Sequence, residues 1–411
     1  MRIAVLGGGI AGLTAAFHLQ QEHDVVLFEA SDRLGGNVHT EEIGGCLVEW
    51  GPQAFLDNEP RTLELVERLG LKDRLVRPTD EAARRFVWRD GKLRALPLKP
   101  WQFLFSSCLP FRARMRALRE PKAPGPPERD ESVYDFAARR IGQGAAEILV
   151  DAMVSGIWAG DPRRLSVRSA FPKLHALERD YGSLIKGAKG RGFGPKGVLT
   201  SFDRGMQVLI DALGEQVDAR LAAPVERVDF DGFDYVVSTI PAPRLAEISR
   251  GELSELLQRI PTAPLAVVAL VLREPVRVPH AFGFLAPHGQ GLRILGTLYE
   301  SSIFPGRAPE GLRLYRVMIG GRRDPEAVQL DDGELEGIVL DDLGKVWGFA
   351  PQPEAVHIFR HQLGIPQYEV GHQELLEQIH AHLTANFRIA GSSFHGVSVN
   401  LCVKEALEWS P

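Results

Sequence analysis

Three glycines near the start of the chain, Gly7, Gly9 and Gly12, have the spacing G-x-G-x-x-G. They follow an apolar run at residues 2–6 that is typical of a buried parallel strand, and they lead into a pattern of helical period at residues 10–20. In such a turn the first glycine permits the tight bend, the second lets the backbone approach a pyrophosphate, and the third lets the helix pack closely on the strand. The spacing therefore predicts that free N–H groups at the start of the helix bind phosphates.

An acidic residue at the end of the next apolar run supports this interpretation. The run DVVLFEA ends at Glu29 and Ala30, and Glu29 follows Gly12 by 17 positions. A carboxylate in this place accepts hydrogen bonds from a ribose diol. Because strand, helix, second strand and terminal acid occur in order, we interpret the segment as a dinucleotide-binding unit.

The stretch directly after this acid, SDRLGGNVHT, distinguishes between dinucleotides. A nicotinamide-dependent dehydrogenase has no special need for a second glycine pair here. A long FAD molecule can use Arg33, Gly35 and Gly36 along its pyrophosphate and ribityl chain. The next segment, IGGCLVEWGPQAFL, adds Gly51 as a further glycine at which the backbone approaches closely.

A glycine loop near the other end of the chain would complete such a site. The segment IAGSSFHGVSVN contains a loop from Gly391 to Gly396, which leads into a helix near Val399. The positive end of that helix would face the N1/O2 edge of a flavin, where negative charge collects on reduction. The two ends of the chain together predict that the cofactor is FAD.

Composition limits the remaining classes of function. The 411 residues are 44% apolar and 25% charged, which is ordinary for a soluble globular protein, and the net charge of −5 argues against a nucleic-acid partner. The three cysteines form no C-x-x-C pair and the histidines show no metal spacing, so no metal site is expected. The early glycine motif leaves no room for a signal peptide, and no apolar run is long enough to cross a bilayer. We expect a cytoplasmic location or attachment to a membrane from its cytoplasmic side.

The order of motifs resembles that of protoporphyrinogen oxidases, within the flavin amine oxidase superfamily. The blocks AGDPRRLSVRSAFP, FPGRAP and IPQYEVGH carry this resemblance most specifically, together with FEASDRLGG and GSSFHGVSVNLC. It implies an α/β fold: a Rossmann-like FAD domain of the p-hydroxybenzoate hydroxylase type, a mixed-sheet substrate domain and a helical insertion. The boundaries we expect are 1–75, 195–240 and 375–411 for the FAD domain, 76–95 and 241–374 for the substrate domain, and 96–194 for a helical membrane-binding domain.

The resemblance also implies the residues of a site. Those expected to bind FAD are Gly7, Gly9, Ile10, Ala11, Gly12, Glu29, Ala30, Arg33, Gly35, Gly36, Gly51, Pro52, Val225, Gly391, Val397 and Val399. Those expected to bind a porphyrinogen are Arg85, Gly156, Ala159, Gly160, Phe282, Phe284 and Leu285. No side chain is assigned as catalytic, because the flavin carries the chemistry. A guanidinium fork suits the propionates of a tetrapyrrole, whereas solvated surface charge, helix-end turns and core packing are the structural alternatives for these residues.

The implied activity is the oxidation of protoporphyrinogen IX by oxygen, in haem biosynthesis. Oxidation of coproporphyrinogen III, amine oxidation and a weakly active tetrapyrrole-binding flavoprotein are the alternatives, and a homodimer is left open. Two departures from the family keep the last of these alternatives open: the segment APVERVDFDGFDYVVST is compressed, and Leu401 replaces the usual aspartate.

A mixture of aromatic and basic residues between Leu96 and Glu120 favours contact with a membrane surface. The aromatic members are Trp101, Phe103, Phe105 and Phe111, and the basic members are Lys99, Arg112, Arg114, Arg116 and Arg119. Packing of the aromatic residues on the protein's own helices is the structural alternative.

Overall fold

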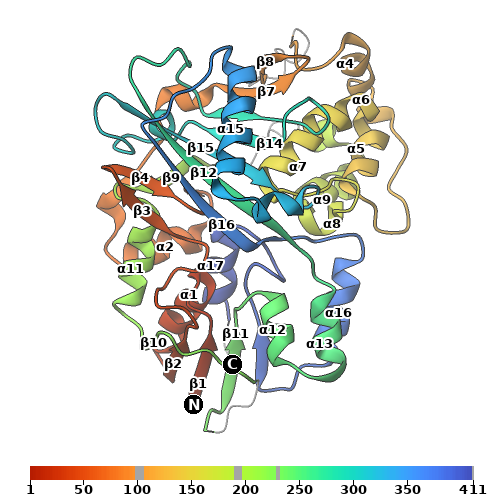
Figure 1. The fold of residues 1–411 in the computed structure, drawn as a ribbon. Helices are drawn as coiled ribbons and strands as arrows, with labels where there is room; N and C mark the ends of the chain where they lie inside the picture. Colours follow the sequence, from red (N-terminus) through yellow and green to blue (C-terminus); the bar gives the residue numbers. More distant parts are fainter. Residues whose placement is uncertain (98–105, 189–196, 228–231, 410–411) are drawn as a thin grey trace. The chain divides into compact units, whose positions relative to one another are not determined.

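The computed structural model describes residues 1–97, 106–188, 197–227 and 232–409, which form two compact units (Figure 1). Unit 1 contains residues 1–77, 196–261 and 373–411, and unit 2 contains residues 78–195 and 262–372. Residues 241–261 thus belong by their contacts to unit 1, whereas the sequence assigned them to the substrate domain. The physical reason is that their two helices cover one face of the unit 1 sheet.

The central sheet of unit 1 is parallel, with the strand order β10-β2-β1-β11-β17. Its strands are β1 (Arg2–Leu6), β2 (Asp24–Phe28), β10 (Ala219–Arg220), β11 (Tyr235–Ser238) and β17 (Phe387–Ile389). Side chains alternate across a strand, so Ile3 and Val5 pack on one face while Ala4 and Leu6 pack on the other. Both faces are therefore buried, as expected for a parallel sheet.

Helices cover both faces of this sheet. The face of Ile3 packs against α1 (Ile10–Leu19), α2 (Pro60–Arg68), α11 (Gln207–Gly214) and α17 (Val399–Leu407). The face of Ala4 packs against α12 (Ala242–Ile248), α13 (Gly251–Gln258) and α16 (His372–Ala381). This layering confirms the Rossmann-like part of the expected fold.

Short strands complete unit 1. They are β3 (Thr40–Ile43) paired with β4 (Cys46–Glu49), and β5 (Phe55–Leu56) and β6 (Leu75–Val76) paired with β9 (Leu199–Phe202). Between β10 and β11, the described residues 221–227 and 232–234 contain no strand. Within the segment that the sequence shows as compressed, the described residues before β11 therefore form no strand.

Unit 2 contains a mixed seven-stranded sheet of order β16-β12-β15-β14-β13-β7-β8. The strands are β7 (Arg85–Arg89), β8 (Lys92–Ala95), β12 (Thr262–Arg273), β13 (Gly283–Leu285), β14 (Ile294–Leu298), β15 (Leu312–Gly320) and β16 (Ala355–Pro366). Leu335, Val339 and Leu343 of α15 (Asp332–Trp347) pack on one face of it. Four residues apart on a helix, these side chains share one face and form the core with the sheet.

The remaining helices of unit 2 lie mostly between β8 and β12. They are α4 (Phe111–Ala117), α5 (Val133–Ile141), α6 (Gln143–Ala145), the π-helix η4 (Ala146–Val150), α7 (Asp151–Trp158), α8 (Val167–Ala170), α9 (Pro172–Tyr181) and α10 (Leu184–Ala188), with the short α14 (Glu300–Ile303) further on. The short 3₁₀ turns of unit 2 are η2 (Asp80–Ala83), η3 (Glu120–Lys122) and η5 (Pro325–Gln329), and a further one, η1 (Lys72–Arg74), belongs to unit 1. Ile148 and Ala152 of this insertion pack against Val87 of the sheet.

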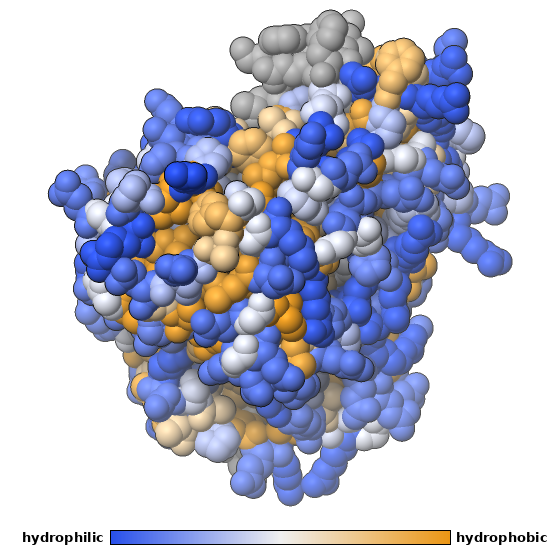
Figure 2. All heavy atoms as spheres, turned by 45° about the horizontal axis from the view of Figure 1, so that its top comes forward, coloured by the Kyte–Doolittle hydropathy of each residue, from blue (hydrophilic) through white to orange (hydrophobic). Residues whose placement is uncertain are grey.

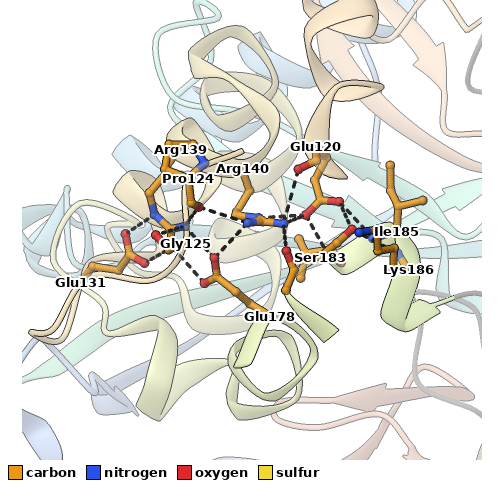
Figure 3. Close-up of polar contacts among 12 residues, drawn as sticks. Glu120, Pro124, Gly125, Glu131, Arg139, Arg140, Glu178, Ser183, Ile185 and Lys186 are labelled. Atoms are coloured by element: carbon orange, nitrogen blue, oxygen red, sulfur yellow. Dashed lines mark hydrogen bonds and ion pairs between the residues drawn. The ribbon is translucent and has the colours of Figure 1, made fainter. Parts of the chain in front are cut away.

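A buried ion network joins the helices of this insertion (Figure 3). Arg140 of α5 is fully buried and forms ion pairs with Glu120 and with Glu178 of α9, the latter at 3.0 Å. Glu120 also accepts hydrogen bonds from the Ser183 hydroxyl at 2.6 Å and from the Leu184 N–H at 2.8 Å. Burial acts to raise the pKa of Glu120, but these hydrogen bonds outweigh it, so the pKa lies below its ordinary value.

Candidate functional site

The glycine turn between β1 and α1 has the geometry that its spacing predicts. Gly7 has a φ of +98°, and a Cβ added to Gly12 would lie 1.9 Å from the Gly7 carbonyl oxygen. Gly9 precedes the helix and no side chain caps it, while a Cβ added there would meet nothing within 4 Å. Two glycines are therefore required by the fold itself, whereas Gly9 leaves open space at the uncapped end of α1, with Ile10 and Ala11 in the first turn.

Glu29 lies beside this turn, directly after β2. Its Oε2 accepts a hydrogen bond from the Gly8 N–H at 2.6 Å, and its Oε1 accepts one from the Ser31 N–H at 2.8 Å. The Ser31 hydroxyl also donates to Oε1, at 2.7 Å. A carboxylate has about four acceptor positions, so one remains for a ribose hydroxyl. The next residue, Ala30, is exposed.

The second glycine pair packs on the first glycine turn. The Gly35 N–H donates to the Gly8 carbonyl at 2.8 Å, and a Cβ added to Gly36 would lie 3.2 Å from the Cα of Gly9. The Arg33 guanidinium donates to the Gly36 carbonyl at 2.7 Å. Burial lowers the pKa of Arg33, against the opposing effect of the Glu29 and Asp32 charges. The structure thus brings the two sequence motifs together.

Three more residues expected at the cofactor, Gly51, Pro52 and Val225, lie in segments that contact the glycine-pair segment or Glu29. A Cβ added to Gly51 would lie 1.7 Å from the carbonyl oxygen of Asn37, so only glycine fits there, and Pro52 follows it. The Ala223 N–H donates to the Glu29 carbonyl at 2.9 Å, which holds the segment leading to Val225 beside the acid.

The C-terminal loop reaches the start of α1. A Cβ added to Gly391, which has a φ of +92°, would lie 3.4 Å from the Cβ of Ala11. The loop continues through Val397 to Ser398, whose side chain caps α17 ahead of Val399. Leu401, the departure from the family pattern, is 45% exposed and lies over Gly396. The expected cofactor residues of both chain ends are therefore neighbours within unit 1.

In unit 2, Arg85 and Phe282 lie side by side. Strands β7 and β13 pair in parallel with Arg85 opposite Gly283, which places the Arg85 Cζ 4.3 Å from the centre of the Phe282 ring. Among the residues that the structure describes, Arg85 has no carboxylate partner. Partial burial lowers its pKa, although the side chain keeps an exposed surface. An unpaired guanidinium next to an aromatic ring suits a carboxylate on a flat ligand.

The other residues expected at the substrate separate into different surroundings. A Cβ added to Gly156 of α7 would lie 2.6 Å from Leu285, so this glycine lets the helix approach β13. Phe284 is 2% exposed and packs with the core beneath α15. Because successive side chains of a strand point to opposite faces, Phe284 and Leu285 do not share one surface. Core packing accounts for Phe284.

A cavity of about 390 Å³ lies in unit 2, and Ala159 and Gly160 are part of its lining. Its charged residues are already paired: Arg323 with Asp151 at 2.6 Å, and Arg293 with Asp324 at 2.6 Å. The other lining residues are Ser155, Ala286, Pro287, His288, Leu292, Ile294, Leu295 and Gly320. Arg85 and Phe282 do not line it.

Comparison with known proteins identifies the family. The model of the flavin-containing amine oxidoreductases matches residues 10–408. The chain belongs to this family. Within it, the human protoporphyrinogen oxidase is 32% identical, with 98% of this chain and 96% of the human protein covered. Coproporphyrinogen III oxidase of Bacillus subtilis is 29% identical over 98% of this chain and 96% of its own length. The expected resemblance is thus confirmed.

A solved structure agrees with these relatives. The crystal structure of a proposed protoporphyrinogen oxidase from an Exiguobacterium species superposes with a TM-score of 0.87 at 25% identity, covering 99% of this chain and 97% of the other. This flavin amine oxidoreductase is therefore an FAD-dependent oxidoreductase, and its fold class is confirmed. The open space at Gly9, the free end of α1 and the Glu29 carboxylate fit the group that the family binds.

Two further properties of the described residues concern membrane-spanning helices and groups of metal ligands. None of the helices in them is both long and apolar enough to span a membrane. They also contain no group of three or more His, Cys, Asp or Glu side chains that could hold a metal ion.

Proposed function

We propose that this oxidoreductase converts protoporphyrinogen IX to protoporphyrin IX in haem biosynthesis, with oxygen as the electron acceptor. Its similarity to the human protoporphyrinogen oxidase over 98% of the chain supports this substrate. The single structural observation that carries the proposal is Arg85, a guanidinium without a carboxylate partner among the described residues, lying over the Phe282 ring. A macrocycle with propionates offers a carboxylate for the Arg85 guanidinium and a flat ring face for Phe282.

The chemistry divides between cofactor and protein. When bound, FAD would supply the redox chemistry, which is the acceptance of hydride from the substrate and the transfer of its electrons to oxygen. Removal of six electrons in three cycles converts three oxygen molecules to hydrogen peroxide. The protein then has to bind and orient the macrocycle, and Arg85 and Phe282 are the residues we assign to that task.

We assign the FAD contacts to the residues that meet around the start of α1. Gly9, Ile10 and Ala11 would lie along the pyrophosphate, and Glu29 would accept from the ribose. The further residues are Gly7, Gly12, Ala30, Arg33, Gly35, Gly36, Gly51, Pro52, Val225, Gly391, Val397 and Val399.

Replacement of Arg85 by alanine tests the substrate contact. We expect KM for the porphyrinogen to rise more than kcat falls, because a charged hydrogen bond of about 1.5–3 kcal/mol is lost equally in the ground and transition states. Steady-state kinetics of porphyrin fluorescence measures this. Arg84→Ala is the matched control, since Arg84 is its exposed neighbour. An unchanged KM in Arg85→Ala would remove Arg85 from the site.

Coproporphyrinogen III is the second candidate substrate, and the Bacillus subtilis relative favours it. It carries two more propionates than protoporphyrinogen IX, so its binding site needs further cationic side chains. Anaerobic mixing of the purified protein with each porphyrinogen distinguishes the two, because bleaching of the flavin bands and porphyrin fluorescence report the first reduction. Faster bleaching by coproporphyrinogen III would overturn the primary assignment, and no bleaching by either would indicate a tetrapyrrole-binding protein without turnover.

We also propose contact with a membrane surface through α4, from the cytoplasmic side. Four residues expected to take part lie outside the described residues: Lys99, Trp101, Phe103 and Phe105. Phe111 is 66% exposed and Leu118 is 44% exposed. The residues between them in the sequence include Arg112, Arg114 and Arg116. In the upper part of Figure 2, apolar side chains stand among hydrophilic ones. This mixture suits a lipid headgroup boundary.

Vesicle binding tests this surface. Wild-type protein should sediment with anionic vesicles at low salt, and both added salt and Phe111→Ser should weaken the association, because it combines charge with apolar contact. Turnover of soluble substrate should persist in the variant. Tyr181→Ser on α9, where the side chain is 43% exposed, serves as the control. Absence of vesicle binding by wild-type protein at low salt would show that the proposed surface is wrong.

A further inference from the structure

The Glu405 carboxylate, on α17, contacts both ends of the loop formed by residues 391–396. The Gly391 N–H donates to its Oε2 at 2.9 Å, and the Nδ1 of His395 lies 2.5 Å from its Oε1. The Glu405 side chain is 16% exposed and that of His395 is 37% exposed. One partly buried carboxylate therefore fixes a whole glycine-containing loop.

The start of this loop forms part of the wall at the N-terminus of α1. Gly391 approaches Ala11, as the 3.4 Å distance of an added Cβ shows, and the preceding Ala390 N–H donates to the Ser238 carbonyl of β11 at 2.9 Å. A contact that holds Gly391 in place therefore also holds the wall beside the N-terminus of α1, where we place the pyrophosphate.

Charged groups from two other elements face this contact. Arg388 of β17 lies within electrostatic reach of Glu405, although burial has the larger effect and lowers the pKa of Arg388. The ring of His380 on α16 is 5.7 Å from that of His395, and burial, followed by the charges of His395 and Arg388, lowers the pKa of His380. Loss of the Glu405 carboxylate would therefore leave three basic side chains close together without an acidic partner from this residue: Arg388, His380 and His395.

We propose that Glu405 is a positioning residue for FAD, which holds the loop of residues 391–396 in the bound conformation before the cofactor arrives. The proposal depends on FAD being the cofactor. Its physical basis is preorganisation: a loop that is already ordered does not have to be ordered at the expense of binding free energy. Sequence reasoning missed this residue because nothing in the local pattern connects a helical glutamate with a glycine loop.

The test compares FAD affinity in apoprotein variants by the change in flavin fluorescence on titration. Glu405→Ala should raise the FAD dissociation constant about tenfold, the effect of one lost charged contact. Glu405→Gln should bind within about threefold of wild type, because an amide oxygen still accepts from the Gly391 N–H. Glu408→Ala, an exposed glutamate on the segment after α17, should bind as wild type does.

A double variant and a stability measurement separate positioning from general structural damage. Glu405→Ala with His395→Ala should bind FAD no more weakly than Glu405→Ala alone, because both act through the same contact. The melting temperature of the apoprotein should differ little between Glu405→Ala and Glu408→Ala. Equal FAD affinity in wild type and Glu405→Ala overturns the proposal, as does failure of Glu405→Gln to restore affinity. Absence of FAD binding by wild type would instead overturn the cofactor assignment.

Discussion

Substitution of Gly9 by valine should yield folded protein that lacks FAD. An added Cβ at this position meets no protein atom within 4 Å, and the residue has an ordinary extended conformation with φ of −72° and ψ of 175°. The new side chain therefore occupies the space where a pyrophosphate would approach the N-terminus of α1. We expect FAD affinity to fall at least about 100-fold, or about 2.7 kcal/mol. The flavin-to-protein absorbance ratio and the FAD dissociation constant measure this.

Gly12→Ala is the matched comparison, because its Cβ would lie 1.9 Å from the carbonyl oxygen of Gly7. That variant should lose thermal stability as well as flavin, whereas Gly9→Val should keep the melting temperature of the apoprotein. Stoichiometric flavin in purified Gly9→Val would contradict the placement of the pyrophosphate at α1.

Replacement of Arg140 by methionine should destabilise unit 2 strongly. The change leaves the Glu120 carboxylate buried without its cation, whereas Glu178 keeps its ion pair with Arg139 at 2.6 Å (Figure 3). Removing one partner of a buried ion pair typically costs about 3–5 kcal/mol, because a charge stays desolvated and uncompensated. The free energy of unfolding in urea, followed by circular dichroism, measures the loss. Arg179→Met on α9 is the control, since its ion pair with Asp180 is exposed and should contribute little.

A second substitution distinguishes charge from packing in this network. Adding Glu120→Gln to Arg140→Met removes the charge of the stranded Glu120 carboxylate and should recover part of the lost stability. If Arg140→Met is no less stable than Arg179→Met, the network does not hold the insertion together. If the double variant is less stable than Arg140→Met alone, lost hydrogen bonds rather than stranded charge explain the effect.

The family and its cofactor were predictable from sequence because their signals are local. Gly7, Gly9 and Gly12 act within one strand-turn-helix unit, and Glu29 closes the following strand, so spacing along the chain alone places them. The sequence also indicated the second glycine pair, whose contact with the first turn follows from its position just after β2.

Contacts between distant segments were decided only by the tertiary structure. Parallel pairing of β7 with β13 brings Arg85 to Phe282, and the same pairing sends Phe284 into the core, which local pattern could not distinguish from a binding role. Glu405 reaches Gly391 only because α17 folds back on its own preceding loop. The physical reason is that spacing specifies which face of an element a side chain occupies, whereas its partner depends on which other element packs there.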